Sequence, residues 1–296
     1  MNGTVMSATR PWDDIGDPNG ISLLRLVPFV ALVTGASSGI GAACARRLAR
    51  EPDARLVLVA RRRERLDELA RELPRATVVA VDLTAAEAPS VVREAVASEH
   101  GELHLLVNNA GASWRGEFGS DDGGWANVER HMRVNFEAPV RLTEALLPLL
   151  RKTAAADPSR RVSIVNVAST AARVSRPRTG AYSASKAALA AWTDALWAEE
   201  LPHGVHVGMV VPGFIPTEGF PARELRQRPL VRWALGTPEG VAEAIVAVGP
   251  GGRVERFVPR GYWLAAAART LLPSVVRRVT ASGALSTSTE PAEPDD

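Results

Sequence analysis

Tyr182 and Lys186 stand four residues apart, and Lys186 is one of only two lysines in a chain that otherwise uses arginine for positive charge. On a helix, this spacing puts the phenol and the ammonium group on one face. A neighbouring cation favours the phenolate, so it would lower the pKa of the tyrosine and improve it as a proton donor and acceptor near neutral pH. An exposed helical face that carries an incidental aromatic side chain would show the same pattern. The pair alone leaves both interpretations open.

A glycine-rich segment follows the first apolar run of the chain. Residues 29–34 lead directly into Thr34-Gly-Ala-Ser-Ser-Gly-Ile-Gly41 and then into a helical pattern. Glycines allow a tight turn and a close approach of the backbone, and the start of a helix offers N–H groups to a pyrophosphate. The spacing is G-x-x-x-G-x-G rather than the common G-x-G-x-x-G, and a turn that only packs a helix on a strand is the alternative. The order strand, loop, helix favours a dinucleotide site.

Short apolar runs alternate with helical patterns along most of the sequence. The runs are β-branched, nearly continuous and bounded by turn residues, as expected of strands that are buried on both faces. The expected strands are residues 29–34, 55–60, 77–81, 103–107, 162–167, 205–210 and 256–259, and the expected helices are residues 39–50, 64–72, 84–100, 122–152, 180–201 and 238–248. This alternation predicts an α/β fold with a doubly wound, seven-stranded, mainly parallel sheet and helices on both faces.

Two helix starts carry local signals. Thr84-Ala-Ala-Glu87 has the pattern of a capping box, and Thr237-Pro238 offers an N-cap followed by proline in the first helical position.

The chain divides into one predicted domain and flanking segments. The domain is expected over residues 28–260, with a lid at about 214–233 where the alternation is interrupted. Residues 1–27 are an N-terminal extension, 261–280 a C-terminal helical segment, and 281–296 a tail rich in Ser, Thr, Pro, Glu and Asp that we expect to be disordered.

Composition limits the classes of function. The chain has 296 residues, 46% of them hydrophobic and 23% charged, with a formal net charge of +2, which is ordinary for a globular protein. Arginines and acids are interspersed, which disfavours a nucleic-acid surface. A single cysteine, and histidines without ligand spacing, predict no metal site. The chain shows neither a secretory signal pattern nor an apolar run near the roughly 18 residues of a membrane span, so we expect a cytoplasmic protein.

The sequence resembles the short-chain dehydrogenase/reductase (SDR) family over about residues 29–260. Several separate motifs occur in that family's order and at its usual separations. They are Thr34-Gly-x-x-x-Gly-x-Gly41, Asp82-Leu-Thr84, Asn108-Asn-Ala-Gly111, Asn135, Ser169, Tyr182-x-x-x-Lys186 and Pro212-Gly213. The resemblance implies a single Rossmann-type domain and an oxidoreductase that moves hydride between a nicotinamide and a carbonyl or alcohol carbon.

The resemblance implies catalytic roles for four residues. Tyr182 would be the general acid in carbonyl reduction, or the base in alcohol oxidation, and Lys186 would lower its pKa and bind the nicotinamide ribose. Ser169 would donate a hydrogen bond to the carbonyl oxygen where charge develops. Asn135 would position a water that relays protons from Lys186 to solvent. Outside this set of motifs, Ser169 could simply end a buried strand and Asn135 could be a kink residue inside a helix.

The resemblance also implies a cofactor site. Asp82 would hydrogen-bond the adenine amino group; the alternative, an acid at a helix start, is disfavoured because Thr84 already supplies a cap. Thr217 would bind the nicotinamide carboxamide, although Pro216 places a second proline in its loop. The expected cofactor-binding residues are Gly35, Ser37, Ser38, Gly39, Ile40, Gly41, Arg61, Arg62, Asp82, Leu83, Asn109, Ala110, Gly111, Tyr182, Lys186, Pro212, Gly213, Ile215 and Thr217.

The end of the second expected strand indicates which cofactor binds. An acid there would accept hydrogen bonds from the 2′-hydroxyl of the adenosine ribose and repel a 2′-phosphate. Ala60 stands in that place, followed by Arg61 and Arg62, and guanidinium groups suit a phosphate dianion. A solvated arginine patch at the start of the next helix is the alternative. We expect NADP(H) rather than NAD(H), with Arg61 as the principal contact.

Aromatic side chains in loops indicate a fairly large, apolar carbonyl or alcohol substrate; aromatic side chains that only pack the lid are the alternative. The expected pocket residues are Trp114, Phe118, Arg173, Val174, Phe214, Phe220 and Trp233. A non-catalytic dinucleotide sensor on the same fold is the alternative function; loss of Tyr182 or Lys186 would have indicated it, and both are present.

Two surfaces suggest partners. The family forms oligomers through its long helices, here 122–152 and 180–201, which implies a homodimer or homotetramer. Residues 262–279 are apolar with arginines near their end and could form an interfacial amphipathic helix. Because Pro273 would break such a helix, we favour docking onto the core or a second subunit over peripheral contact with a membrane.

Overall fold

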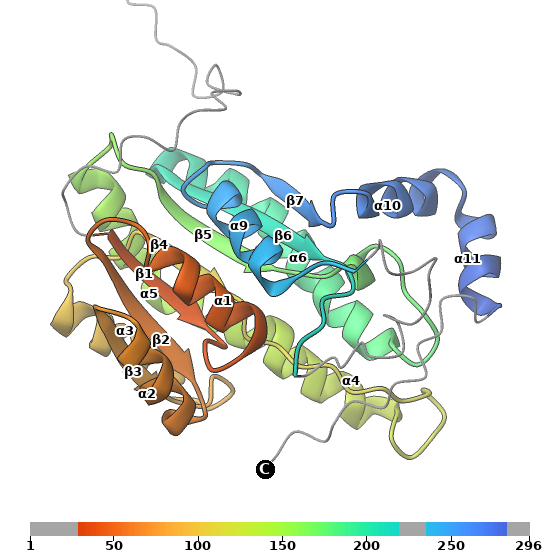
Figure 1. Cartoon of the computed structure of the whole chain (residues 1–296). Helices are drawn as coiled ribbons and strands as arrows, with labels where there is room; N and C mark the ends of the chain where they lie inside the picture. Colours follow the sequence, from red (N-terminus) through yellow and green to blue (C-terminus); the bar gives the residue numbers. More distant parts are fainter. Residues whose placement is uncertain (1–28, 219–234, 283–296) are drawn as a thin grey trace, which may run out of the picture.

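The protein, described by a computed structural model over residues 29–218 and 235–282, is built on one seven-stranded sheet. The strand order is β3-β2-β1-β4-β5-β6-β7, and every neighbouring pair is parallel (Figure 1). The predicted doubly wound Rossmann-type sheet is confirmed. The predicted N-terminal extension, the tail from residue 283 and most of the predicted lid lie outside the described residues.

The strands follow the predicted apolar runs closely. They are β1 (Phe29–Thr34), β2 (Ala54–Ala60), β3 (Ala76–Ala80), β4 (Leu105–Asn108), β5 (Val162–Val167), β6 (Val205–Pro212) and β7 (Glu255–Val258). Successive side chains point to opposite faces of a strand, so in β1 Ala31 and Val33 enter one apolar cluster while Val30 and Leu32 enter another. Both faces are therefore buried, which explains why the runs are continuously apolar.

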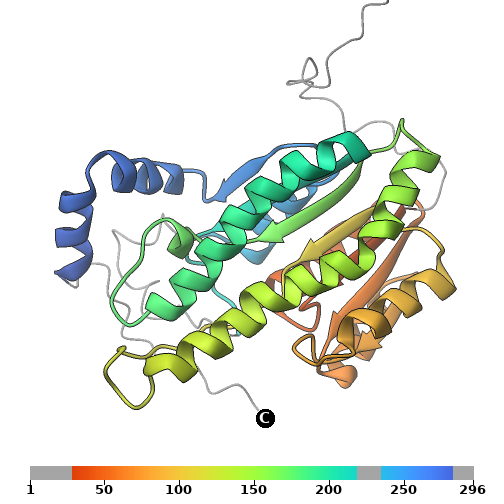
Figure 2. The ribbon, with the colours of Figure 1, turned by 180° about the vertical axis from the view of Figure 1, so that it is seen from behind.

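Helices cover both faces of the sheet (Figures 1 and 2). One face carries α1 (Gly39–Leu48), α2 (Arg63–Glu72) and α9 (Pro238–Val248). The other carries α3 (Ala88–Glu99), α5 (Ala138–Ala156) and α6 (Gly180–Glu200). The shorter elements are α4 (Gly124–Met132), the π-helical turn η1 (Arg133–Glu137), and the 3-10 turns η2 (Thr170–Ala172) and η3 (Leu201–His203).

One predicted helix start is confirmed and another is wrong. Thr237 accepts a hydrogen bond from the Gly240 backbone N–H at 3.0 Å, and α9 starts at Pro238. Thr84 caps nothing, because its N–H and its hydroxyl both donate to the Asp82 carboxylate at 2.8 Å, and α3 begins only at Ala88. The sequence disfavoured a structural role for Asp82 because Thr84 was expected to cap the helix. That expectation is wrong, since the Asp82 carboxylate accepts both hydrogen bonds and organises the turn before α3.

The predicted helix over 122–152 is also interrupted. It consists of α4, η1 and α5, and the π turn surrounds the buried Asn135. The side-chain amide of Asn135 forms hydrogen bonds with the backbone of Ala112, a residue of the loop after β4. A widened turn of this kind often marks a functional site in a helix.

The C-terminal segment forms two helices, α10 (Tyr262–Leu271) and α11 (Pro273–Ala281), with the break at Pro273 that the sequence predicts. Neither helix contains a buried residue. The start of α10 nevertheless contacts the core, because the Tyr262 ring packs against Gly213 and Phe214. Docking on a second subunit stays a prediction. None of the helices in the described ranges has both the length and the apolar character needed to cross a membrane.

Candidate active site

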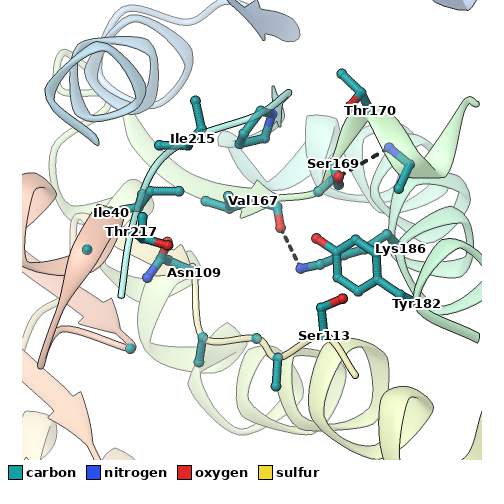
Figure 3. Close-up of a pocket in the computed structure, with 18 of the residues that line it drawn as sticks. Ile40, Asn109, Ser113, Val167, Ser169, Thr170, Tyr182, Lys186, Ile215 and Thr217 are labelled. Carbon is teal, nitrogen blue, oxygen red and sulfur yellow. Dashed lines mark hydrogen bonds between the residues drawn. The ribbon is translucent and has the colours of Figure 1, made fainter. Parts of the chain in front are cut away.

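A cavity of about 1080 Å³ opens at the carboxyl ends of the strands. The connection after β1 goes to the helices on one face of the sheet, whereas the chain after β4 goes to the helices on the other. Neighbouring strands whose connections diverge in this way leave a crevice between them, and ligands of such folds bind there. Figure 3 shows the side chains that surround this space.

Thr34, at the end of β1, joins the two diverging loops. Its hydroxyl donates to the carbonyl of Val107 at 3.1 Å and accepts from the backbone N–H groups of Asn109 and Ala110 at 2.9 and 3.0 Å. The Asn109 side chain in turn donates to the Thr34 carbonyl at 2.9 Å. This network fixes the Asn108–Gly111 motif against the glycine loop.

The glycine loop places the start of α1 against the cavity. A Cβ atom at Gly41 would lie only 2.1 Å from the carbonyl oxygen of Gly35, so the turn can close only with glycine there. Ser38, the N-cap of α1, forms no side-chain cap, and its hydroxyl accepts from Arg62 at 3.0 Å instead. The first turn of α1 is the type of site that binds a pyrophosphate.

Tyr182, Lys186 and Ser169 meet at the other end of the cavity (Figure 3). Lys186 is 4% exposed, and its Nζ atom donates to the carbonyl of Val167 at 2.9 Å. Ser169 caps η2 by accepting from the Ala171 N–H at 3.1 Å. The first turns of α6 thus bring the phenol and the ammonium group to the end of β5.

Burial shapes the acid–base properties of this group. It lowers the pKa of Lys186 to about 8. It also raises the pKa of Tyr182, against a hydrogen bond with Ser169 and the positive charge of Arg176, which both lower it. Arg176 is therefore one cation that lowers the pKa of the phenol. The influence of Lys186 on the pKa of Tyr182, which its spacing suggested, stays a prediction.

Asn135 stands behind the cavity wall and is fully buried. Its Oδ1 accepts from the Ala112 N–H at 3.0 Å, and its Nδ2 donates to the Ala112 carbonyl at 2.9 Å and to Ser185 Oγ at 3.1 Å. A Cβ atom at Gly111 would lie 2.8 Å from Asn135 Oδ1 and 3.3 Å from Lys186 Nζ. Gly111 thus allows this loop to touch both residues, and the proton-relay role of Asn135 stays a prediction.

His131 is a positioning residue that the sequence did not single out. Its Nδ1 donates to the Asn127 carbonyl at 2.7 Å and its Nε2 accepts from the Trp114 N–H at 3.0 Å, which fixes a neutral tautomer. Burial lowers its pKa in agreement with that form. The ring meets Tyr182 edge-on, with 6.1 Å between ring centroids. His131 therefore connects the loop after β4 with the tyrosine.

Two arginines follow β2 at the rim of the cavity. Arg62 donates to Ser37 Oγ at 3.2 Å and Ser38 Oγ at 3.0 Å, and it lies 3.5 Å from Glu218. Arg61 is exposed and forms no hydrogen bond or ion pair with the residues that the structure describes.

Most predicted site residues line one cavity. Of the expected cofactor residues, all but Gly41 do so, since Gly41 lies behind Gly35. Among the expected substrate residues, Phe118 does not: it is 76% exposed and lies outside the cavity lining. Phe220 and Trp233 lie outside the described residues. The lining side chains that the sequence missed include Arg115, Arg176, Tyr262 and Leu264.

The fold and this cavity define a protein of the dinucleotide-binding α/β class. The family model of the short chain dehydrogenases matches residues 29–227, and the chain belongs to that family, whose members are oxidoreductases that bind a nicotinamide dinucleotide.

Relatives agree with this assignment. Dehydrogenase/reductase SDR family member 7B of Xenopus laevis is 36% identical over 199 residues, which cover 64% of this chain and 58% of the relative, less than two thirds of its length. Ketoacyl reductase HetN of Nostoc sp. is 31% identical over 228 residues and 76% of each chain. A short chain dehydrogenase of Burkholderia cenocepacia, solved in complex with NADP, has a TM-score of 0.70 and 27% identity, covering 86% of this chain and 98% of its own.

Proposed function

We propose that the protein is an NADP(H)-dependent oxidoreductase that interconverts a carbonyl compound and a secondary alcohol. The observation that carries the proposal is the juxtaposition of Tyr182, Ser169 and Lys186 in a cavity that continues to the glycine loop. The proposal includes a homodimer or homotetramer, by analogy with the family, which light scattering on the purified protein would measure, and a cytoplasmic location.

The residues present fit a dinucleotide. The start of α1 faces the cavity, and Gly35, Gly39 and Gly111 leave backbone at the cavity without Cβ atoms. Thr217 lies beside Gly39, because a Cβ atom at Gly39 would be 3.1 Å from Thr217 Cγ2, so the loop after β6 reaches the glycine loop. The cofactor supplies the hydride for the carbonyl carbon.

The acid–base half of the reaction belongs to the protein. Tyr182 donates its phenol proton to the carbonyl oxygen as the hydride arrives at carbon, and Ser169 donates a hydrogen bond to the same oxygen. Lys186 would hold the ribose hydroxyls of the cofactor and would favour the phenolate that remains. In alcohol oxidation, the phenolate takes the hydroxyl proton back.

The preference for NADP(H) is supported by the rim of the cavity after β2. Ala60 places no carboxylate at the end of β2, Arg62 is oriented by Ser37 and Ser38 and also pairs with Glu218, and Arg61 is accessible beside it. A relative bound to NADP adds weight. The combined substitution Ala60→Asp and Arg61→Ile should reverse the ratio of NADPH to NADH affinity, measured by quenching of protein fluorescence. Unchanged NADPH affinity would contradict the assignment.

Replacement of the tyrosine tests the mechanism. Because general acid catalysis contributes on the order of 10²–10⁴-fold, Tyr182→Phe should lower kcat by about that factor in NADPH oxidation with a panel of aldehydes, ketones and β-keto thioesters. NADPH affinity should remain, which separates chemistry from folding. Full turnover in Tyr182→Phe would refute the mechanism, and NADPH binding without turnover of any carbonyl by the wild type would favour a dinucleotide sensor.

A further inference from the structure

Glu218, in the loop after β6, reaches the arginines that follow β2, and no step of the proposed reaction uses it. One of its carboxylate oxygens lies 3.5 Å from Nη2 of Arg62, and the other accepts a hydrogen bond from Nη1 of Arg65 at 2.5 Å. All three side chains line the cavity. Because β2 and β6 lie on opposite sides of β1 in the sheet, this contact bridges two edges of the cavity.

Arg62 stands between the end of β2 and the glycine loop. The nitrogen atom that faces Glu218 also donates to Ser37 Oγ at 3.2 Å and to Ser38 Oγ at 3.0 Å. In doubly wound folds the adenosine ribose of a dinucleotide lies between the glycine loop and the end of the second strand. Arg62 is therefore fixed where a ribose 2′-phosphate would lie, and Glu218 places a negative charge at the same point.

The carboxylate of Glu218 is charged at neutral pH, because the hydrogen bond from Arg65 lowers its pKa. Among the described residues that line the cavity, Asp82 is the only other acid. The Asp82 carboxylate accepts two hydrogen bonds from Thr84 in the turn after β3. Of these two lining carboxylates, Glu218 is thus the one that pairs with the arginines of the rim.

A carboxylate and a phosphate use the same donors. Both accept charge-assisted hydrogen bonds from guanidinium groups, and two anions at one guanidinium repel each other. The Arg62 and Glu218 side chains are 39% and 53% exposed, so water reaches both charges and their separation costs little. A ligand that brings a phosphate to Arg62 can therefore replace the carboxylate there.

We propose that Glu218 is a specificity-determining residue for the cofactor, whose carboxylate occupies Arg62 and Arg65 until a ribose 2′-phosphate displaces it. The proposal rests on the proposed function and concerns only the rim after β2. Arg61 is exposed and has no partner among the residues that the structure describes, so it is available to the phosphate at once. Arg62 becomes available by exchange, and Glu218 thus lowers the affinity for NADP(H) but not for NAD(H).

A different role for Glu218 makes a different prediction. A carboxylate near the adenosine ribose could accept a hydrogen bond from the 2′-hydroxyl of NAD(H), as an acid in the place of Ala60 would do. Its removal would then weaken ligands with a free 2′-hydroxyl. The distances favour exchange, because each carboxylate oxygen of Glu218 already faces an arginine.

The experiment uses ligands that differ only in the 2′-phosphate. We would measure by calorimetry the Kd of adenosine 2′,5′-bisphosphate and of adenosine 5′-phosphate, and then of NADPH and NADH, in the wild type, Glu218→Gln and Glu64→Gln. Glu64 lies in the first turn of α2 next to Arg65 in sequence, is exposed and does not line the cavity. Glu64→Gln therefore removes the same charge near the rim without a change at Arg62, and none of these measurements needs turnover.

We expect Glu218→Gln to bind the bisphosphate and NADPH about 2- to 10-fold more tightly than the wild type, the worth of a half-exposed ion pair. Its affinities for adenosine 5′-phosphate and NADH should not change. Glu64→Gln should keep the wild-type ratio between the two adenosine ligands. In a background with both Arg62→Met and Arg65→Met, the gain from Glu218→Gln should vanish, because the partners of the carboxylate are absent.

Three results would overturn the proposal: an unchanged ratio in Glu218→Gln, an equal gain in Glu64→Gln, or weaker binding of adenosine 5′-phosphate and NADH by Glu218→Gln. In each case, a wild-type preference for the bisphosphate would leave the NADP(H) assignment standing. If the wild type and Glu218→Gln both bound the two adenosine ligands equally, the NADP(H) assignment would fail together with this inference.

Discussion

Lys186 is charged in ordinary surroundings, but in this protein burial opposes its charge. The group has a pKa near 10.5 in an unfolded chain and about 8 in the folded protein. Between these values the unfolded chain keeps a proton that the folded protein has released. Stability therefore rises with pH across this window on account of Lys186.

Replacement by Met removes this linkage. Between pH 8 and 10.5 the wild type should gain about 2–3 kcal/mol of unfolding free energy that Lys186→Met does not gain. The stability of the variant relative to the wild type should therefore fall by that amount as the pH rises. Urea unfolding at several pH values measures the difference. Lys152, the second lysine of the chain, is exposed, so the stability difference between Lys152→Met and the wild type should not change with pH. A stability difference for Lys186→Met that also stays constant with pH would mean that Lys186 titrates as it does in an unfolded chain.

The candidate site could be predicted from sequence only where its residues form local motifs. Tyr182 and Lys186 lie on one helix, and the glycine loop is continuous, so spacing alone brings each set together. His131 and Arg176 could not be found in this way. His131 gains its role from Trp114, and Arg176 from Phe214, contacts between distant segments that only the folded chain creates.

At the scale of elements, Thr84 and Thr237 both stand where the sequence predicts a helix N-cap, but only one of them stabilises a helix start. Thr237 accepts a capping hydrogen bond at the start of α9, whereas the Thr84 hydroxyl donates to Asp82 in a turn. Thr237→Ala should therefore cost about 1 kcal/mol of stability, and Thr237→Ser should cost much less. Thr84→Ala should change the urea midpoint less than Thr237→Ala. The reverse order would contradict the assignment of the caps.

Strands were easier to predict than helix ends for a physical reason. A strand buried on both faces of a parallel sheet must be apolar throughout, and this property is visible in the sequence. A Thr with a Glu three residues later fits a capping box and also a turn, because the hydroxyl can accept or donate. The π turn around Asn135 depends on its contact with Ala112, so no local pattern predicted it.

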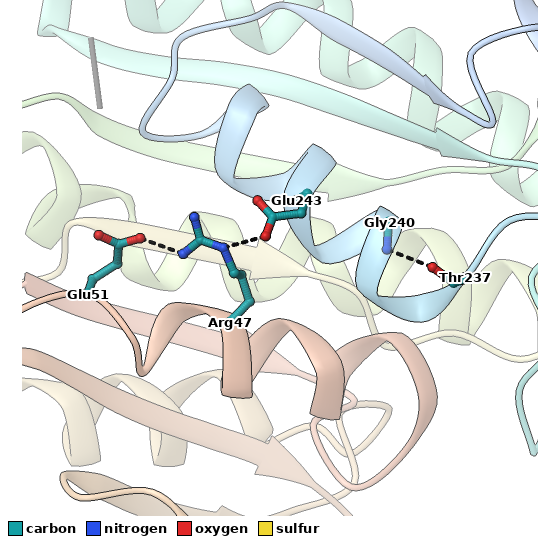
Figure 4. A network of polar contacts seen from close by, with 5 residues as sticks. All are labelled: Arg47, Glu51, Thr237, Gly240 and Glu243. Carbon is teal, nitrogen blue, oxygen red and sulfur yellow. Dashed lines mark hydrogen bonds and ion pairs between the residues drawn. The ribbon is translucent and has the colours of Figure 1, made fainter. Parts of the chain in front are cut away.

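At the scale of the whole molecule, a polar contact joins the first and last helices on one face of the sheet. Arg47, near the end of α1, donates to Glu51 at 2.5 Å and to Glu243 of α9 at 2.7 Å (Figure 4). The Arg47 and Glu51 side chains are only 17% and 14% exposed. The link connects elements almost 200 residues apart in the chain.

Because removal of one partner leaves the other charge poorly solvated, Arg47→Met should lower the free energy of unfolding by about 1–2 kcal/mol. Arg46→Met, which breaks the exposed pair with Glu72, should have little effect. A double-mutant cycle with Glu243→Gln would isolate the coupling between the two helices. Since Arg47 lies at the opposite end of α1 from Gly39, NADPH affinity should not change. If Arg46→Met lost as much unfolding free energy as Arg47→Met, the burial of the Arg47 ion pairs would make no additional contribution to stability.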